Sequence, residues 1–221
     1  TKRAGAESIT AIIPYFGYSR QDRSKHKYEP ISASLVIKLI ETAGVTKIVT
    51  LDLHSAQIEG MFNAPVTCLA SDSIFFPALE DKQNIIVVSP DIGGVARARS
   101  YCSLLNANLA IINKDRNANN VCSMSGIIGD INGKDCIIVD DIVDGANTIC
   151  MATDLLLQNG AKTVEVAVTH AVLSGDAISK IEKSEIKKIY VSDSISHKQL
   201  PEKFVTMPVA ELISSTLKKA F

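Results

Sequence analysis

The sequence predicts a soluble α/β fold. Short apolar runs rich in β-branched residues alternate with stretches of helical periodicity along most of the 221 residues, which is the pattern of strands that feed helices. A hydrophobic content of 46% allows one large core or two smaller ones. The balance of 23 basic and 24 acidic residues indicates no basic nucleic-acid-binding surface, so we expect no nucleic-acid partner.

The cysteines and the hydropathy pattern indicate a reducing compartment. The cysteines follow no Cys-x-x-Cys spacing, which favours reduced core residues over a disulfide framework. The sequence shows neither a signal-peptide pattern nor an apolar run of membrane-spanning length. We therefore expect a cytoplasmic protein without membrane contact. The cysteines are Cys68, Cys102, Cys122, Cys136 and Cys150.

The first fifty or so residues predict a shortened start, two strands and a helix. Thr1–Ala4 has the composition of a helix interior and no initiator Met, so we expect a fragment, a processed form or a shortened gene product. Apolar runs over Thr10–Pro14 and Lys47–Leu53 predict strands. A helix is predicted over Ser32–Ala43, because its apolar residues fall on one stripe and Gly44 can stop it. The stripe consists of Leu35, Val36, Leu39 and Ile40.

Polar segments follow both of these strands. After the first strand, aromatic residues adjoin Arg20, Gln21 and Asp22. Because guanidinium groups bind phosphates and stack on rings, this segment is a candidate nucleotide site, with a solvated loop as an equally good alternative. After the second strand, His54 stands where open α/β sheets hold ligands, although a lone histidine is more often structural.

The second half of the chain continues the alternation. Residues 65–81 read as a connection between two units, and a polar excursion is expected over residues 193–203. Strands are predicted over Ile85–Ser89, Asn108–Asn113, Thr163–His170 and Lys188–Ser192, and helices over Thr148–Asn159 and Val209–Ala220.

A Gly-Gly turn after the strand at Ile85–Ser89 is a candidate pyrophosphate loop. Gly93 and Gly94 let backbone N–H groups approach an anion closely, and Asp91 can hold a metal ion that bridges to it. Further on, Lys114 and Arg116 open an Asn- and Ser-rich segment that runs to residue 125. Such a segment can form a mobile loop that closes over charge in a transition state, and its composition fits surface decoration equally well.

The clearest motif is a strand, an acidic turn and a helix. A β-branched run ends at Asp140 and Asp141, and small residues lead from there into the helix that Gly160 can close. The N–H groups of such a turn suit a phosphate, while the carboxylates suit hydroxyl groups or a hydrated metal ion. A sugar phosphate fits both halves, and a buried strand with an acidic helix cap is the alternative.

These motifs resemble those of a known family. Residues 140–148 are similar to the ribose-phosphate loop of type I phosphoribosyltransferases. Residues 14–23 resemble the Pro-Tyr-x-x-Tyr-Ala-Arg-Gln-Asp-Arg segment of ribose-phosphate pyrophosphokinases, also called phosphoribosyl pyrophosphate synthetases. The resemblance covers essentially the whole chain and includes Asp-Leu-His at 52–54, Ser-Pro-Asp-x-Gly-Gly at 89–94, Lys-x-Arg at 114–116 and Thr-His-x-x-x-Ser-Gly at 169–175.

The resemblance implies an α/β fold of two phosphoribosyltransferase-type domains with mainly parallel sheets, the first of them incomplete. Residues 1–65 would be the remainder of the N-terminal domain, residues 66–207 the C-terminal domain, and residues 208–221 a terminal helix that packs on the first domain. The implied reaction transfers the β,γ-diphosphoryl group of ATP to O1 of ribose 5-phosphate. It gives phosphoribosyl pyrophosphate and AMP, uses Mg²⁺ as cofactor, and takes place in a homo-oligomer.

The family motifs imply a role for each matching residue. Lys114 and Arg116 would be catalytic, His54 and Asp91 would hold the metal ion, and His170 is expected to be structural or to support the site indirectly. The implied ATP-binding residues are Arg20, Gln21, Asp22 and His54, the pyrophosphate loop is Asp91, Gly93 and Gly94, and the ribose 5-phosphate site is Arg116, Asp140, Asp141, Asp144, Gly145, Ala146, Asn147 and Thr148.

The chain also departs from the family pattern. The family's chain begins before Thr1, with a loop that contacts adenine in the neighbouring subunit, and ends after Phe221. Its phosphate cradle has Thr where Gly145 stands and Gly where Asn147 stands, and Asn is the non-glycine residue that best tolerates a left-handed backbone. A lost hydroxyl donor would weaken phosphate binding by about 1.5 to 3 kcal/mol. These departures leave open a non-catalytic subunit that assembles with an intact synthetase, whereas the ATP-site motifs argue against an ordinary phosphoribosyltransferase.

Overall fold

The computed structural model describes residues 1–24, 26–116 and 122–220. The chain forms two compact units, an N-terminal unit of residues 1–71 that also takes in the chain from residue 209 on, and a C-terminal unit of residues 72–208. Both units contain sheets flanked by helices, and all strand pairs except one are parallel in the described part of the chain. The predicted α/β fold with mainly parallel sheets is therefore confirmed.

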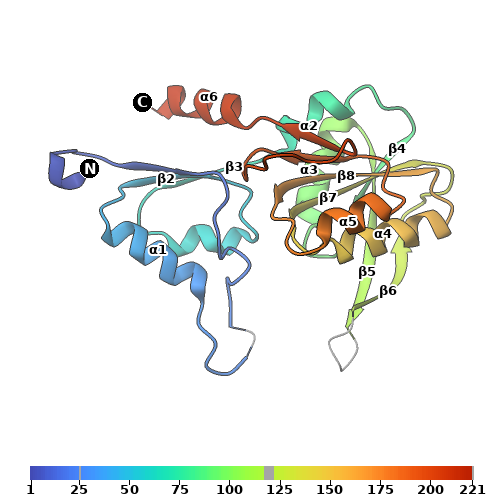
Figure 1. Ribbon diagram of the computed structural model, residues 1–221, viewed down its shortest axis with the longest axis horizontal. Helices are drawn as coiled ribbons and strands as arrows, with labels where there is room; N and C mark the ends of the chain where they lie inside the picture. Colours follow the sequence, from blue (N-terminus) through green and yellow to red (C-terminus); the bar gives the residue numbers. More distant parts are fainter. Residues whose placement is uncertain (25, 117–121, 221) are drawn as a thin grey trace. The chain divides into compact units, whose positions relative to one another are not determined.

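The N-terminal unit has a three-stranded parallel sheet in the order β1-β2-β3. Its core lies between this sheet and α1, where Phe16, Ile37, Leu53 and Ile58 are buried. The elements are β1 (Thr10–Ile13), α1 (Ser32–Thr42), β2 (Lys47–Leu51), β3 (Val66–Leu69) and α6 (Ala210–Ala220), with single 3₁₀ segments at Lys2–Ala4 and Ala56–Met61 (Figure 1).

The buried stripe of α1 differs from the predicted one. Ala33 and Ile37 are fully buried and Val36 packs against them, but Leu35 is 55% exposed and Leu39 is 60% exposed. The predicted stripe is thus half wrong, because Val36 and Ile40 pack against the core while Ala33 and Ile37 take the places expected for Leu35 and Leu39. Periodicity indicates that an apolar face exists, and only the packing partner decides which residues it buries.

The segment at residues 65–81, predicted as a connection, contains a strand and a helix. β3 pairs in parallel with β2, so it belongs to the N-terminal unit and not to the second domain as the predicted boundary at residue 65 had it. α2 (Asp72–Leu79) buries Phe75 and Leu79 in the C-terminal unit, and the two units separate between residues 71 and 72. Four residues of β-branched and apolar character were enough for a strand because β2 supplies the hydrogen bonds.

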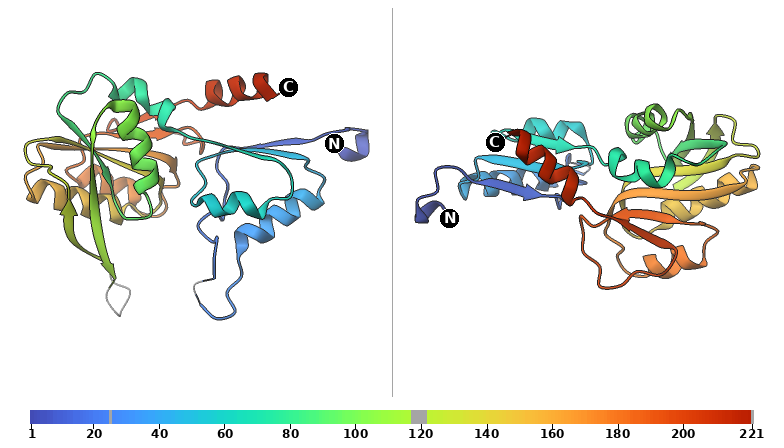
Figure 2. Two further views of the ribbon diagram at one scale, coloured as in Figure 1. Left: turned by 180° about the vertical axis from the view of Figure 1, so that it is seen from behind. Right: turned by 90° about the horizontal axis from the view of Figure 1, so that it is seen from above.

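The C-terminal unit has a seven-stranded sheet in the order β10-β9-β8-β7-β4-β5-β6. Helices α4 and α5 cover one face of this sheet, and α2 and α3 cover the other (Figures 1 and 2). The central strands β7 and β8 are therefore buried on both faces, which explains their nearly continuous apolar character. The bounds are β4 (Ile85–Ser89), α3 (Val95–Leu105), β5 (Asn108–Arg116), β6 (Cys122–Ile128), β7 (Asp135–Val143), α4 (Asn147–Gln158), β8 (Thr163–Ala171), α5 (Ala177–Lys183), β9 (Ile189–Ser192) and β10 (Phe204–Met207).

In the polar segment after Asn113, residues 114–116 and 122–125 belong to the two strands of a hairpin, and residues 117–121 lie outside the described residues. β5 continues to Arg116 and pairs in antiparallel fashion with β6, with a register shift between Asn113 and Lys114. The ladder of Ile111 and Ile128 at its base extends into the polar residues, since main-chain hydrogen bonds do not depend on side-chain polarity.

In the described residues, no helix is both long and apolar enough to cross a bilayer.

Candidate functional site

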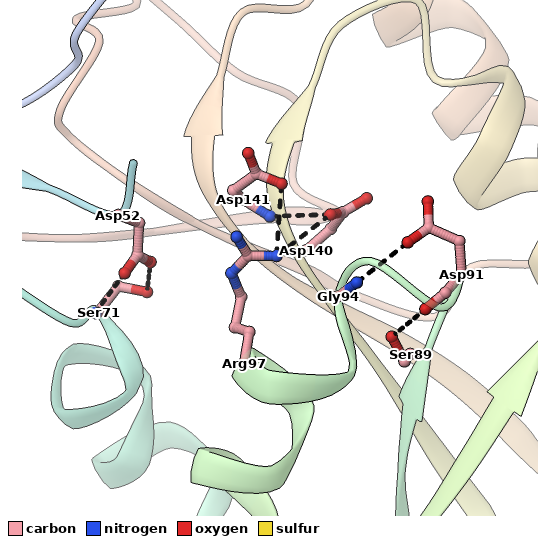
Figure 3. A network of polar contacts seen from close by, with 8 residues as sticks. All are labelled: Asp52, Ser71, Ser89, Asp91, Gly94, Arg97, Asp140 and Asp141. Atoms are coloured by element: carbon pink, nitrogen blue, oxygen red, sulfur yellow. Dashed lines mark hydrogen bonds and ion pairs between the residues drawn. The ribbon is translucent and has the colours of Figure 1, made fainter. Parts of the chain in front are cut away.

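Two carboxylates and one guanidinium group meet near the carboxyl end of β7. Asp140 and Asp141 lie on this strand, and the backbone N–H of Asp141 donates to Asp140 Oδ1 at 2.9 Å. Arg97 extends from the first turn of α3, and its Nη1 lies 3.6 Å from Asp140 Oδ1 and 3.4 Å from Asp141 Oδ1 (Figure 3). Open α/β sheets bind ligands at this end of their strands, so the cluster is well placed for a ligand.

The Asp140 carboxyl is poorly stabilised as an anion. Burial raises its pKa to about 8, and the negative charges of Asp141 and Asp91 act in the same direction. The positive charge of Arg97 lowers this pKa without compensating for the other effects. Burial and the neighbouring acids thus outweigh Arg97 at Asp140, so hydroxyl donors or a cation would stabilise its ionised form.

The predicted pyrophosphate loop joins β4 to α3. The Gly94 N–H donates to Asp91 Oδ1 at 3.0 Å, and Ser89 Oγ donates to the backbone carbonyl of Asp91 at 2.7 Å (Figure 3). A Cβ atom on Gly94 would lie 2.9 Å from Ser89 Oγ, so a side chain here would displace the Ser89 hydroxyl from its place. The N-terminus of α3 has no side-chain cap, and its N–H groups have no acceptor within the helix.

The predicted ribose-phosphate loop joins β7 to α4. Asp144, Gly145 and Ala146 form the turn, and α4 begins at Asn147 and continues through Thr148. Its N-terminus also has no side-chain cap, so the N–H groups of the first turn remain for an anion. The predicted strand and helix on either side of this loop are confirmed, and the helix ends differ from the prediction by one residue. Gly160 follows the helix with a left-handed backbone at φ 92°, as expected of a residue that closes it.

The left-handed residue of the loop is Ala146 and not Asn147. We expected Asn147 to tolerate a left-handed backbone in place of glycine, but it is the first residue of α4, while Ala146 has φ 62°. The left-handed residue thus stands one position earlier than expected, and this conformation costs an alanine about 1 to 2 kcal/mol. Gly145 is not strained, and a Cβ atom added there meets no heavy atom within 4 Å. There is open space at this position for the Cβ of a threonine.

A serine from a distant loop supports the third acid of the motif. Ser174, in the connection between β8 and α5, donates its hydroxyl hydrogen to Asp144 Oδ1. Leu173 beside it has a left-handed backbone at φ 52°, which turns the chain toward this contact. Ser174 belongs to the Thr-His-x-x-x-Ser-Gly segment, but the family resemblance assigned it no role. Neither Ser174 nor Arg97 was predicted as a site residue.

In the N-terminal unit, Arg20 and Gln21 line one pocket of about 340 Å³. This volume suits part of a nucleotide, and the pocket contains both cations and aromatic rings. Asp22 is half-buried and is not among the lining residues. The pocket is lined by Tyr15, Tyr18, Arg20, Gln21, Arg23, Glu29 and Pro30.

His54 follows a tightly held turn in the same unit. Asp52 has φ 39°, and its carboxylate accepts hydrogen bonds from the backbone N–H of Ser71 at 3.3 Å and from the Ser71 hydroxyl (Figure 3). These bonds fix the chain at the end of β2, two residues before His54, whose side chain is exposed. The turn explains why the strand ends at Leu51 and not at Leu53 as predicted.

The remaining candidates are described only in part. Lys114 and Arg116 lie on β5 near its end, but their side chains lie outside the described part of the structure. His170 is 1% exposed, and its Nδ1 lies 2.9 Å from Ser194 Oγ, which is a structural contact as expected. Among the described residues, no group of three or more His, Cys, Asp or Glu side chains is arranged to hold a metal ion.

Comparisons with known proteins identify the family of the chain. Two family models match the chain, the N-terminal domain of ribose phosphate pyrophosphokinase over residues 1–44 and the phosphoribosyl synthetase-associated domain over residues 122–221. The ribose-phosphate pyrophosphokinase of Thermosipho africanus is 47% identical over 220 residues, which cover 98% of this chain and 70% of that protein. The corresponding protein of Halalkalibacterium halodurans is 46% identical with the same coverage.

A solved structure extends the similarity to the whole fold. The crystal structure of phosphoribosylpyrophosphate synthetase from Mycobacterium smegmatis superimposes with a TM-score of 0.90 at 36% identity, and the match covers 100% of this chain and 74% of that one. The chain thus spans about 70% of the length of the relatives that it matches. With this identity over this length, the chain belongs to the ribose-phosphate pyrophosphokinase family, whose members are enzymes of phosphoribosyl pyrophosphate synthesis.

Proposed function

We propose that this chain transfers the β,γ-diphosphoryl group of ATP to O1 of ribose 5-phosphate, giving phosphoribosyl pyrophosphate and AMP. The O1 hydroxyl oxygen forms a bond to the β phosphorus of ATP and releases its proton to solvent, while the bond from that phosphorus to the oxygen bridging it to the α phosphorus breaks and AMP leaves. The observation that carries this proposal is the loop between β7 and α4, which offers carboxylates and an uncapped helix N-terminus within a few residues. A sugar phosphate has the hydroxyl groups and the phosphate that these two features bind.

The residues of the C-terminal unit would bind the sugar phosphate. Asp140 and Asp141 would accept hydrogen bonds from ribose hydroxyl groups, and Asp144, held by Ser174, would fix the turn. The backbone N–H groups of Gly145, Ala146, Asn147 and Thr148 would hold the 5-phosphate at the positive end of α4, with Arg116 as a further cation.

The residues of the N-terminal unit would bind ATP. Arg20 and Gln21 line a pocket with two tyrosines, where a guanidinium group can stack on a base or pair with a phosphate. Asp22 and His54 would complete this site. Lys114 and Arg116 would stabilise the charge on the transferred group, since phosphoryl transfer depends mainly on positioning and on neutralising negative charge.

Magnesium is the proposed cofactor, with Asp91 as a candidate ligand in the C-terminal unit and His54 as a candidate ligand in the N-terminal unit. Mg²⁺ in phosphate-transfer sites takes one or two carboxylates together with substrate phosphates and waters, so Asp91 beside the Gly-Gly loop is a sufficient donor for such an ion. When bound, the ion would neutralise charge on the diphosphoryl group. The protein would contribute the loop N–H groups, which hold the same phosphates.

Calorimetric titration of ribose 5-phosphate in the presence of Mg²⁺ tests the sugar-phosphate site. We would compare the natural chain with Gly145→Thr, which adds the hydroxyl that the family cradle has, and with Gly60→Thr as a control. Gly60 also has open space around an added Cβ, but it lies in the N-terminal unit. We expect the natural chain to bind, Gly145→Thr to bind up to about tenfold more tightly, and the control to match the natural chain.

Formation of phosphoribosyl pyrophosphate and AMP, followed by ³¹P NMR with ATP, ribose 5-phosphate and Mg²⁺, tests the reaction itself. Binding without turnover would refute the catalytic proposal and favour a subunit that assembles with an intact synthetase. If only Gly145→Thr binds ribose 5-phosphate, the absence of the cradle hydroxyl has inactivated the site, and this also favours the non-catalytic subunit.

A further inference from the structure

Arg97 connects the two loops to which the proposed function assigns phosphate groups. It lies on the first turn of α3, directly after the Gly-Gly loop, and a Cβ atom on Gly94 would lie 3.8 Å from its Nη1. The same nitrogen lies 3.4 Å from Asp141 Oδ1 and 3.6 Å from Asp140 Oδ1 (Figure 3). One guanidinium group therefore lies against one loop and reaches the carboxylates that precede the other.

The geometry is that of a shared cation. Charge-assisted N–H···O bonds are usually 2.7 to 2.9 Å long, and both distances here are longer, so Nη1 lies between the two carboxylates and not in a short bond to either. The side chains are largely withdrawn from water, with exposures of 18% for Arg97, 20% for Asp140 and 6% for Asp141. A surface ion pair between a helix and a strand would be more exposed to water than this cluster is.

We propose that Arg97 is a positioning residue of the ribose 5-phosphate site. Its guanidinium group holds the Asp140 and Asp141 carboxyl groups side by side and favours their ionised form, in the orientation in which they accept hydrogen bonds from ribose hydroxyl groups. This assignment rests on the proposed function, because it takes ribose 5-phosphate as the ligand of the acid pair. It adds a residue from α3 to a site that is otherwise built from β7, α4 and the loops beside them.

The charges around Asp140 give the proposal a specific consequence. Asp141 and Asp91 both disfavour a second negative charge there, and Arg97 favours it. Without Arg97, the acid pair would keep a proton to higher pH, and a protonated carboxyl group is a poorer acceptor for ribose hydroxyl groups. The loss of Arg97 should therefore weaken sugar-phosphate binding and also move its pH dependence toward higher pH.

Calorimetric titration of ribose 5-phosphate with Mg²⁺ between pH 6.5 and 9 tests this. Arg97→Gln should weaken binding about tenfold at pH 7.5 and raise the pH of half-maximal affinity by about one unit. Arg97→Lys should return that pH to the natural value because the charge is restored, while its affinity stays lower because an ammonium group lacks the guanidinium's reach. Arg99→Gln removes the same charge from an exposed position on the same helix and should change neither quantity.

The possible outcomes separate this proposal from the proposed function. If the natural chain does not bind ribose 5-phosphate, both proposals fail. If it binds and Arg97→Gln binds with the same affinity and pH dependence, only the role of Arg97 fails. If circular dichroism shows that Arg97→Gln does not fold, Arg97→Lys decides: weaker binding with an unchanged pH dependence supports the positioning role, and unchanged affinity refutes it.

Discussion

Replacing Asp140 with asparagine should stabilise the ligand-free protein and weaken its binding of sugar phosphate. Burial and the neighbouring negative charges raise the pKa of Asp140 from 3.8 to about 8. An acid whose pKa is higher in the folded state binds its proton more tightly there, so folding stability is lost as the pH rises from 3.8 toward 8. Asparagine cannot ionise, yet its side-chain oxygen can still accept the Asp141 N–H bond.

The structure sets the size of this effect. Each pH unit between the two pKa values changes stability by about 1.4 kcal/mol, so the advantage of Asp140→Asn should grow with pH, by up to about 3 kcal/mol from pH 5 to pH 7. The Asp140 side chain keeps 20% exposure, and water screens part of its charge, so these figures are upper bounds. Ribose 5-phosphate affinity should fall at the same time, because an amide has one acceptor oxygen in place of two and cannot ionise when ribose hydroxyl groups approach.

Urea unfolding followed by circular dichroism at pH 5, 7 and 8.5, without ligand, measures the difference. Asp176→Asn is the control, because this exposed carboxylate pairs with Lys180 at 2.8 Å and its hydrogen bond with Lys180 lowers its pKa. The control should gain no stability with rising pH. If the difference between the natural chain and Asp140→Asn stays constant from pH 5 to 8.5, Asp140 does not carry the raised pKa, and the account of the acid pair is wrong.

Three further changes probe other contacts. Lys203→Met removes hydrogen bonds of 2.9 to 3.0 Å from its ammonium group to three carbonyl groups around the end of α5. The free energy of unfolding measured in urea should fall by about 2 kcal/mol. An equal fall for the exposed Lys198→Met would contradict this cause. Ser174→Ala leaves Asp144 without the serine hydroxyl, so calorimetry should show about tenfold weaker ribose 5-phosphate binding; unchanged affinity would make this contact merely structural. Burial raises the pKa of the Cys136 thiol to about 12, so a disulfide reagent at pH 8 should label it only after unfolding, and labelling of the native protein would show that it is not buried.

The element from β7 to α4 could be predicted because its signals are local. A β-branched run, a pair of acids, small residues and a closing Gly160 lie within one stretch of sequence, and each favours the same structure. The face of α1 and the existence of β3 depend on partners elsewhere in the chain. Leu35 and Val66 are equally apolar in the sequence, but only packing against β2 and its neighbours decides that one is exposed and the other is part of a sheet.

The same distinction applies to the site. The backbone positions of Asp140 and Asp144 follow from the motif, whereas their side-chain partners Arg97 and Ser174 come from other loops, and the contact from Ser174 to Asp144 spans 30 residues of sequence. Such partners can be predicted only when the order of strands is known, because parallel strands bring the ends of separate loops to one edge of the sheet. Ala146 shows a different limit, since its residue type gives no sign of a left-handed backbone.

Three features of this loop and its flanks destabilise the ligand-free folded protein, and a bound ligand would relieve this destabilisation. Ala146 is held in a backbone conformation that alanine disfavours, α4 begins without a side-chain cap, and Asp140 is buried beside another acid. A phosphate at the start of α4 would satisfy its N–H groups, and hydroxyl groups or a cation would stabilise the acid pair. Because all three costs occur within one turn and its flanks, and one sugar phosphate could offset at least two of them, strain and charge argue for the same ligand as the motif does.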